Sequence, residues 1–274
     1  GVTKELESNT TAEEVTNANS LTSFNKNGFT VGSSNNENQN GVDYIAFLWS
    51  AGSHEGLLPT INTAGDIKSL VSVNDAAGFS IVKYIGNGGT GQSVGTGMSS
   101  APELVLFKRI DASVNWFVFV KVGGVYKRLE GLNTDSTAGS VSSFGATSTT
   151  ITWSGTTSDF NGNGNEYIMY CFKSISGYSS VGTYTGQTSG VTVTTGFKPR
   201  FILVKSTSNV ENWVILTSDL GSGNALKANT DAGNDVSSRN TFTLSDTGFS
   251  FPHQSTADAA LNENGYEYIY LAIK

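Results

Sequence analysis

Short apolar runs alternate along the chain with polar stretches rich in Gly, Ser, Thr and Asn. The apolar runs contain many β-branched and aromatic residues, which favour strands, whereas Gly and Asn favour the turns between them. Residues that favour helices cluster only at residues 11–15 and 257–261, where two short helical turns are expected. The pattern therefore predicts an all-β protein made of antiparallel strands of about five or six residues.

A motif with the pattern Asn-Gly-x-(Asp/Glu)-Tyr-Ile occurs three times, at residues 40–45, 163–168 and 264–269. Asn-Gly is a turn signal because both residues tolerate positive φ. Each copy runs directly into an apolar segment with large side chains at successive positions. The motif is therefore predicted to be a turn that leads into a strand buried on both faces.

A second motif occurs twice, at residues 102–118 and 199–215. Each copy has a proline, an apolar run that ends in a lysine (Lys108 or Lys205), a short polar stretch and an Asn-Trp pair, at identical spacings. Two apolar runs joined by a short polar turn predict a β-hairpin.

Further anchors recur in the same order, and they define internal repeats. Residues 78–86 parallel residues 177–186, Asn-Thr-Asp occurs at residues 133–135 and 229–231, and residues 2–10 resemble residues 125–134. The chain is therefore expected to start in the middle of a repeat. The predicted organisation is the back half of a repeat at residues 1–50, a linker at 51–77, a second repeat at 78–173 and a third at 174–274.

Each complete repeat is predicted to be an antiparallel β-sandwich of about seven to ten strands. A half repeat would leave strand edges and one core face exposed. We expect the missing front half to belong to the same gene product, or another subunit to cover the exposed core.

Composition narrows the possible partners. Charged residues make up 14% of the chain, against about 25% in ordinary globular proteins. The net charge of −7 and the lack of a basic cluster argue against binding to nucleic-acid phosphates. No apolar run approaches the roughly 18 residues of a membrane span, so no membrane insertion is expected.

The residues that commonly carry chemistry do not form a recognisable site. Cys171 is the only cysteine and lies in an apolar run, so a buried structural thiol is expected and no disulfide can form within the chain. His54 and His253 have no other ligand at the spacing of a metal site. No nucleophile elbow occurs in a strand-turn-helix context.

Two glycine- and asparagine-rich segments match the start of known binding motifs. Residues 86–91 read Gly-x-Gly-x-x-Gly, but a dinucleotide site needs a helix next, and the polar stretch up to Pro102 predicts none. Residues 159–164 resemble the opening of a calcium loop, but the twelfth position, which needs Glu, is Tyr170. Both segments are expected to be ordinary turns, with a calcium site as the less favoured alternative.

Three equivalent acids and three tryptophans suggest carbohydrate chemistry. A glycosidase needs two carboxylates at one bond, whereas here each repeat supplies one, so each acid is expected to be a solvated edge charge or a cross-strand partner of a lysine instead. The tryptophans lie among apolar residues, so core packing is favoured over sugar stacking. The acids are Asp43, Glu166 and Glu267, and the tryptophans are Trp49, Trp116 and Trp213.

Residues 48–109 carry a family resemblance. They contain Leu-Trp-Ser-Ala-Gly at 48–52, Gly-Phe-Ser at 78–80 and Ser-Ala-Pro-Glu-Leu-Val-Leu-Phe-Lys-Arg at 100–109. The chain resembles, over nearly its whole length, a repeat domain of uncharacterised function found in large structural and tail-fibre proteins of tailed bacteriophages, many from aquatic hosts. It departs from that pattern at Thr96, where His is expected, and at Met98, where Leu is usual. The resemblance implies a virion context and supplies no catalytic residues.

These observations favour a non-enzymatic phage virion structural protein at the virion surface. The preferred role is a tail-fibre or receptor-binding component that acts as a β-sandwich spacer and adhesion module; a capsid decoration protein or head fibre is the alternative, and a polysaccharide depolymerase is a third hypothesis. The expected partners are other virion proteins, a host-surface glycan or protein, and further copies of the chain, with a trimer favoured. No catalytic, metal or cofactor-binding residue is predicted, and the sequence identifies no ligand-binding residue.

Overall fold

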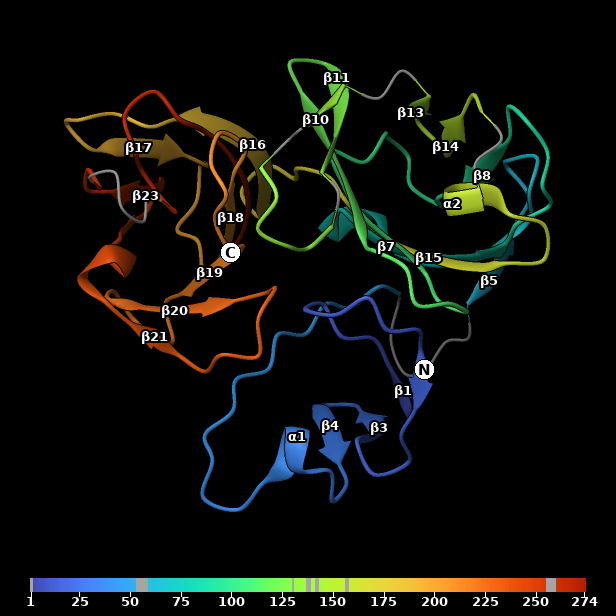
Figure 1. Cartoon of the computed structure of the whole chain (residues 1–274), viewed down its shortest axis with the longest axis horizontal. Coiled ribbons are helices and arrows are strands. Elements are labelled where there is room, and N and C mark those ends of the chain that lie inside the picture. Colours follow the sequence, from blue (N-terminus) through green and yellow to red (C-terminus); the bar gives the residue numbers. More distant parts are fainter. Residues whose placement is uncertain are drawn as a thin grey trace.

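The computed structural model describes residues 2–52, 59–129, 131–136, 139–140, 143–155, 158–254 and 260–274. About 42% of the residues form strands and 6% form helices, so the prediction of an all-β protein is confirmed. All strand pairs among the described residues are antiparallel, and one isolated parallel bridge joins Ile67 to Val94. Figure 1 shows three regions around a common centre: an N-terminal region (residues 2–52), a central region (59–173) and a C-terminal region (174–274).

The N-terminal region contains two small antiparallel pairs. Strand β1 (Lys4–Glu5) pairs with β2 (Val15–Thr16), β3 (Leu21–Asn25) pairs with β4 (Gly28–Val31), and a short helix, α1 (Asn35–Asn38), follows. The helical turn expected at residues 11–15 is wrong, because residues 11–14 form no helix and Val15 begins β2. Glu14 donates its backbone N–H to the carbonyl of Ile110, so a long-range contact overrides the local helix propensity.

The central region has an eight-stranded sheet in the order β12-β11-β10-β9-β15-β7-β6-β5, and a three-stranded sheet, β13-β14-β8, covers one of its faces. Its elements are β5 (Thr60–Asn62), β6 (Ser69–Asn74), η1 (Asp75–Ala77), β7 (Phe79–Ile85), β8 (Ser93–Gly95), β9 (Leu104–Arg109), β10 (Phe117–Val122), β11 (Val125–Leu129), β12 (Gly139–Ser140), β13 (Phe144–Ala146), β14 (Thr150–Trp153), α2 (Ser158–Asn161) and β15 (Glu166–Phe172).

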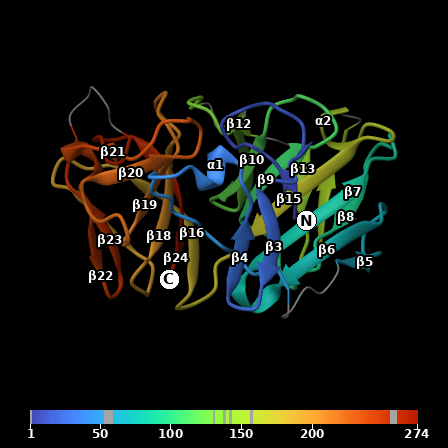
Figure 2. The same ribbon diagram turned by 90° about the horizontal axis from the view of Figure 1, so that it is seen from below.

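The C-terminal region has a six-stranded sheet in the order β16-β24-β18-β19-β20-β21 and a three-stranded sheet, β17-β23-β22. Its elements are β16 (Ser179–Thr185), β17 (Val191–Thr194), β18 (Phe201–Ser206), β19 (Val214–Thr217), β20 (Asn224–Lys227), β21 (Asp235–Val236), η2 (Ser238–Asn240), β22 (Thr243–Ser245), β23 (Gly248–Phe251) and β24 (Glu267–Ile273). The helical turn expected at residues 257–261 lies largely outside the described residues. Figure 2 shows the large sheets of the two regions side by side.

The two large sheets share one strand order, since β11-β10-β9-β15-β7 corresponds to β20-β19-β18-β24-β16. The hairpins predicted from the second motif are confirmed: β9 pairs with β10, and β18 pairs with β19. The turns predicted from the Asn-Gly motif are confirmed too, because Gly41, Gly164 and Gly265 have φ values of 77°, 78° and 79°. The strand predicted after the motif is confirmed for the second and third copies, where β15 and β24 lie inside the sheets with neighbours on both sides. For the first copy this prediction is wrong: residues 43–49 form no strand, because no described strand pairs with them.

Part of the segment predicted to be a linker belongs to a sheet. Strands β5 and β6, within residues 51–77, extend the central sheet beyond β7. The alternating sequence of β6 allows this, because Val71 reaches the core beneath the sheet while Leu70, on the other face, is exposed. Glycines and a proline nearby mark turns within this segment, and they do not exclude strands between those turns.

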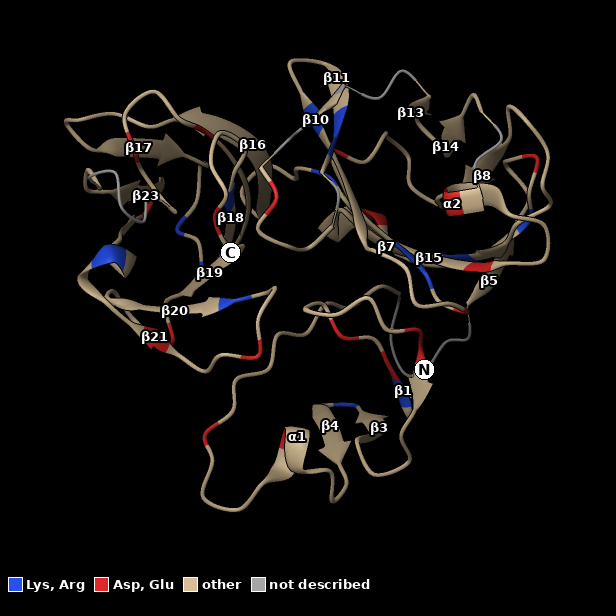
Figure 3. Ribbon diagram, in the orientation of Figure 1, with Lys and Arg blue, Asp and Glu red and all other residues tan. Residues whose placement is uncertain are grey.

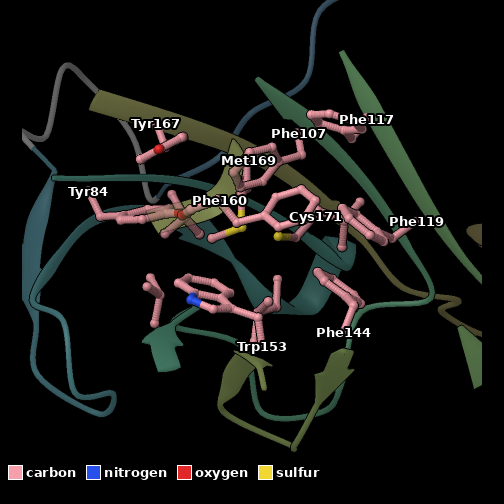
Figure 4. Packing of buried hydrophobic residues seen from close by; sticks show 14 of the residues in the cluster. Tyr84, Phe107, Phe117, Phe119, Phe144, Trp153, Phe160, Tyr167, Met169 and Cys171 are labelled. Carbon is pink, nitrogen blue, oxygen red and sulfur yellow. The ribbon is translucent and has the colours of Figure 1, made fainter. Parts of the chain in front are cut away.

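Each of the two large sheets covers a core of its own. In the central region, rings from the large sheet (Tyr84, Phe107 and Tyr167) meet Trp153 of the small sheet and Phe160 of α2, as Figure 4 shows. The C-terminal region has a corresponding core between its two sheets, with Phe249 and Phe251 facing Tyr268 and Tyr270. Cys171 is buried in the first of these cores, as predicted, and burial raises the pKa of its thiol.

Candidate functional site

A third apolar cluster joins the regions, and we call it the shared core. It forms between the outer faces of the two large sheets, which are the faces turned away from the small sheets. The buried members are Phe79, Leu104, Trp116, Val118, Val120, Leu129, Leu132 and Phe172 of the central region and Phe201, Leu203, Trp213, Ile269, Leu271 and Ile273 of the C-terminal region. Both large sheets are therefore covered on both faces, as their unbroken apolar strands require.

The N-terminal region also enters the shared core. Residues 40–52 pass between the other two regions in Figure 1. The Phe47 ring lies 5.0 Å from that of Phe201, and the Trp49 ring lies 5.3 Å from Phe201 and 6.3 Å from Phe172. These side chains follow the first Asn-Gly motif at the same offsets as Tyr170 and Phe172 follow the second. We call residues at such matching positions counterparts.

A hydrogen bond at each Asn-Gly motif is the same in all three regions. The tyrosine hydroxyl of the motif accepts the backbone N–H of the residue just before the motif. The pairs are Gln39 with Tyr44 (2.9 Å), Gly162 with Tyr167 (2.8 Å) and Glu263 with Tyr268 (2.9 Å). The local geometry therefore persists in the N-terminal region although fewer strands surround the motif there.

The two motif lysines are buried and connect successive regions. Lys108 donates from Nζ to the carbonyls of Arg109 (2.7 Å), Ala112 (3.3 Å) and, in the N-terminal region, Thr11 (3.4 Å). Burial lowers the pKa of Lys108. An ammonium group so enclosed is stabilised by the carbonyl oxygens that it contacts.

Lys205 repeats this arrangement one region further along the chain. Its Nζ donates to the carbonyl of Ser206 (2.9 Å) and to that of Thr134 in the central region (3.3 Å). Burial lowers the pKa of Lys205 to about 8. In both cases a lysine of one region reaches an Asn-Thr loop of the preceding region, so the contacts run in one direction.

Three further hydrogen bonds hold the N-terminal region in place. The indole Nε1 of Trp116 donates to the carbonyl of Glu7 (3.0 Å), and the hydroxyl of Ser8 donates to the carbonyl of Ala228 in the C-terminal region. The third is the backbone bond from Glu14 to Ile110 (2.9 Å). The N-terminal region thus contacts both other regions.

The glycine-rich segment at residues 86–91 leads into strand β8 and not into a helix. The buried side chain of Asn161 holds it: its Oδ1 accepts the backbone N–H of Asn87 (2.9 Å), and its Nδ2 donates to the carbonyl of Gly89 (2.8 Å). A Cβ at Gly86 would lie 2.3 Å from the carbonyl oxygen of Gly162, so glycine is required for this close approach. Asn161 belongs to the calcium-like sequence, and its amide is occupied by this structural contact.

The three motif acids are not brought together at one bond. Glu166 forms an ion pair with Lys83 on the neighbouring strand (2.8 Å). Glu267 accepts a hydrogen bond from Thr185, also on the neighbouring strand (2.7 Å). Asp43 is exposed in the N-terminal region. Each acid therefore lies in a different region, and Glu166 and Glu267 contact polar side chains on neighbouring strands and do not form the convergent pair that a glycosidase needs.

The remaining candidates lie where structural roles place them. Trp116 and Trp213 are buried and Trp49 is partly buried, all in the shared core, as the sequence predicts. His253 is exposed, and His54 lies outside the described residues. Within the described part of the chain, no three His, Cys, Asp or Glu side chains are placed to hold a metal ion. Figure 3 shows acidic and basic residues interspersed over the three regions.

The N-terminal region carries large apolar side chains that face solvent, and we call them the N-terminal apolar face. They are Phe24 (64% exposed), Phe29 (38%), Tyr44 (48%) and Leu48 (57%). Large exposed apolar side chains gathered between residues 24 and 48 make this region a candidate interaction surface. The half repeat in the sequence predicts an exposed core face, but only the structure identifies these residues.

No described helix has both the length and the apolar character that a membrane span needs.

Comparisons with known proteins place the chain in one family. Neither curated proteins nor solved structures give a match. A family model covers residues 1–274, and the chain belongs to this family, which is described as a domain of unknown function (DUF7483).

Proposed function

We propose that the chain is a non-enzymatic structural protein of a bacteriophage virion, built of tandem β-sandwich repeats. In this proposal the central and C-terminal regions are complete repeats, and the N-terminal region carries the back half of another. The preferred role is a tail-fibre or receptor-binding component at the virion surface. Its partners would be other virion proteins and a glycan or protein of the host surface.

The repeat organisation is supported by details that composition cannot produce. The two large sheets have the same strand order, and the three motif tyrosines accept equivalent hydrogen bonds. The hairpins β3–β4 and β22–β23 also have one register, since Phe24 pairs with Phe29 as Leu244 pairs with Phe249. Agreement at this level favours copies of one unit over unrelated β-structures.

The shared core is the observation that carries the proposed spacer role. Because the large sheets are covered on both faces, their side chains support the scaffold, and binding is left to loops and edges. Loops held by a rigid β-scaffold commonly carry recognition. A glycan or protein of the host would be bound by the Asn, Asp and aromatic residues of these loops.

The second candidate is a capsid decoration protein or head fibre. It is favoured by the arrangement of the three regions around one centre, because a row of beads would suit an elongated fibre better. Both roles need a rigid module that resists proteolysis, and they differ in where the protein lies on the particle.

Localisation on the intact particle tests the proposal. Cryo-electron microscopy or antibody labelling of virions is expected to place the protein on the tail, at tens of copies or fewer. Density confined to the capsid shell, at hundreds of copies, would favour the second candidate. Absence of the protein from purified particles would contradict both.

The non-enzymatic part has a separate test. A depolymerase requires two carboxyl groups about 5 to 10 Å apart in one cleft, whereas Glu166 and Glu267 each contact a strand of their own region. Incubation of the protein with host capsular polysaccharide is expected to leave its chain length unchanged. A shortened polysaccharide, lost in a Glu166→Gln or Glu267→Gln variant, would identify an enzyme.

A further inference from the structure

The N-terminal apolar face has counterparts that are buried elsewhere in the molecule. Phe29 and Tyr44 are exposed, whereas their counterparts in the C-terminal region, Phe249 and Tyr268, are 1% and 0% exposed. Leu48 corresponds to Ala272, which is fully buried in the same core. Side chains of the same pattern are thus covered in one region and uncovered in the other.

The backbone of residues 43–49 differs from its counterparts in the same way. Strand β24 is bonded to β16 on one side and to β18 on the other, and β15 is bonded likewise to β7 and β9. Residues 43–49 make no backbone hydrogen bond with any described residue. A segment with unpaired N–H and C=O groups offers edges to which strands can be added.

The directed lysine contacts indicate what an added segment would carry. Lys108 reaches the loop at Thr11 and Lys205 reaches the loop at Thr134, so each Asn-Thr loop of the first two regions receives a lysine from the next region. The corresponding loop of the C-terminal region contains Thr230, whose carbonyl accepts no hydrogen bond from the described residues. Ser8 already contacts Ala228 beside this loop, so the N-terminal region is adjacent to it.

We propose that the N-terminal apolar face binds a polypeptide segment with the strand pattern of residues 177–217. Two strands of this segment pair with the two edges of residues 43–49, as β16 and β18 pair with β24. A third strand covers the hairpin β3–β4, as β17 covers β23. The lysine of the segment, at the position of Lys205, donates to the carbonyl of Thr230.

This recognition is chemically specific. The segment needs apolar side chains that face inward at the positions of Ile202 and Val204, which belong to the C-terminal core. It also needs one cation for the carbonyl of Thr230, because the added segment would otherwise cover this carbonyl without a partner. This binding follows from matching strand registers and does not depend on a virion role, so the location of the protein on a particle neither supports nor contradicts it.

A fusion protein tests the inference directly. A copy of residues 177–220 is placed immediately before Gly1. The copied Leu220 then precedes Leu6 by the same number of residues as Leu220 precedes Leu226 in the native chain. Hydrogen exchange of the amides of residues 43–49 is expected to slow by at least about 100-fold relative to the unmodified chain. Unchanged exchange in this segment would overturn the proposal.

Two variants of the added copy serve as controls. Replacing the copied Ile202 and Val204 by Asp is expected to abolish the protection, and replacing the copied Lys205 by Met is expected to reduce it about tenfold or more. Full protection in the Asp variant would overturn the proposal, because an attached chain would then act without specific packing. Full protection in the Met variant would overturn the lysine contact.

A second fusion guards against the case in which the first simply fails to fold. It carries a copy of residues 78–123 before Gly1, which preserves the Gly-Val sequence found at residues 124–125. The same protection of residues 43–49 is expected. Loss of the folded state in both fusions would contradict the proposal, since packing of the added segment against the N-terminal apolar face is expected to stabilise that region.

Discussion

The N-terminal and C-terminal regions contain the same hairpin in different surroundings. In β3–β4, Asn25 pairs with Gly28 and Phe24 with Phe29; in β22–β23, Ser245 pairs with Gly248 and Leu244 with Phe249. Phe29 nevertheless faces solvent, whereas Phe249 is buried. Local sequence therefore determines the turn and the register, while the energetic weight of each side chain depends on the strands that cover it.

The largest effect is expected for these two phenylalanines. Phe249→Ala removes a ring from a packed core and is expected to lower the free energy of unfolding by about 3–5 kcal/mol. Phe29→Ala, its matched control, is expected to change that free energy by no more than about 0.5 kcal/mol. Urea denaturation measures both, and equal losses would mean that the two regions do not differ in packing.

The asparagines two residues before the Asn-Gly motif give the next largest difference. Asn262 is buried; its Oδ1 accepts the N–H of Gln187, and its Nδ2 donates to three carbonyls. Its exposed counterpart Asn38 makes one side-chain hydrogen bond, to Gly32.

Replacing Asn262 by Ala leaves buried groups without partners, so a loss of about 2–3 kcal/mol is expected. Asn38→Ala is expected to cost less than about 0.5 kcal/mol. Thermal or urea unfolding of both variants measures the difference. A small loss for Asn262 would show that water replaces its hydrogen bonds.

The pH dependence of stability reports on Lys205. Its pKa is about 8 in the folded chain and 10.5 in its unperturbed state, so the unfolded chain binds more protons between these values. The stability of the wild type relative to Lys205→Met is therefore expected to rise by about 1–2 kcal/mol from pH 7 to pH 9. Paired urea titrations at several pH values measure it, and a flat difference would show that the ammonium is well solvated.

The motif tyrosines give the smallest difference. Tyr268→Phe removes a buried hydroxyl that accepts the N–H of Glu263, and a loss of about 1 kcal/mol is expected. Tyr44→Phe removes the same bond at an exposed position, where water can replace it, so a loss of a few tenths is expected. Similar losses at both sites, measured by urea unfolding, would argue that the N-terminal motif is as well packed as the C-terminal one.

Much of the local structure could be predicted from sequence because it depends on residues close in the chain. The turns at Gly164 and Gly265 and the hairpin β18–β19 follow from turn chemistry and apolar runs. The buried thiol of Cys171 follows from its apolar neighbours. Strand β6 was not predicted, because the glycines around it indicated a linker.

The candidate surfaces could not be predicted in the same way. The apolar pattern of β24 indicates two buried faces, but it does not say that Phe47 and Trp49, more than 200 residues earlier, cover one of them. The spacing around Lys205 revealed a repeated motif and not its contact with Thr134, which is 71 residues away. Contacts over such long sequence separations depend on how the regions pack against one another. The spacing of residues within one region does not encode that packing.

The one-way lysine contacts have a consequence for symmetry. A contact that joins a donor patch to a different acceptor patch is heterologous, and it either closes into a ring or continues as an open helix. Here two such steps, followed by the return contact from Ser8 to Ala228, describe a cyclic order of three within one polypeptide. In a homotrimer every substitution appears at three places at once. In this chain each of the three regions can change independently, so one region can diversify in sequence while the other two keep the scaffold intact.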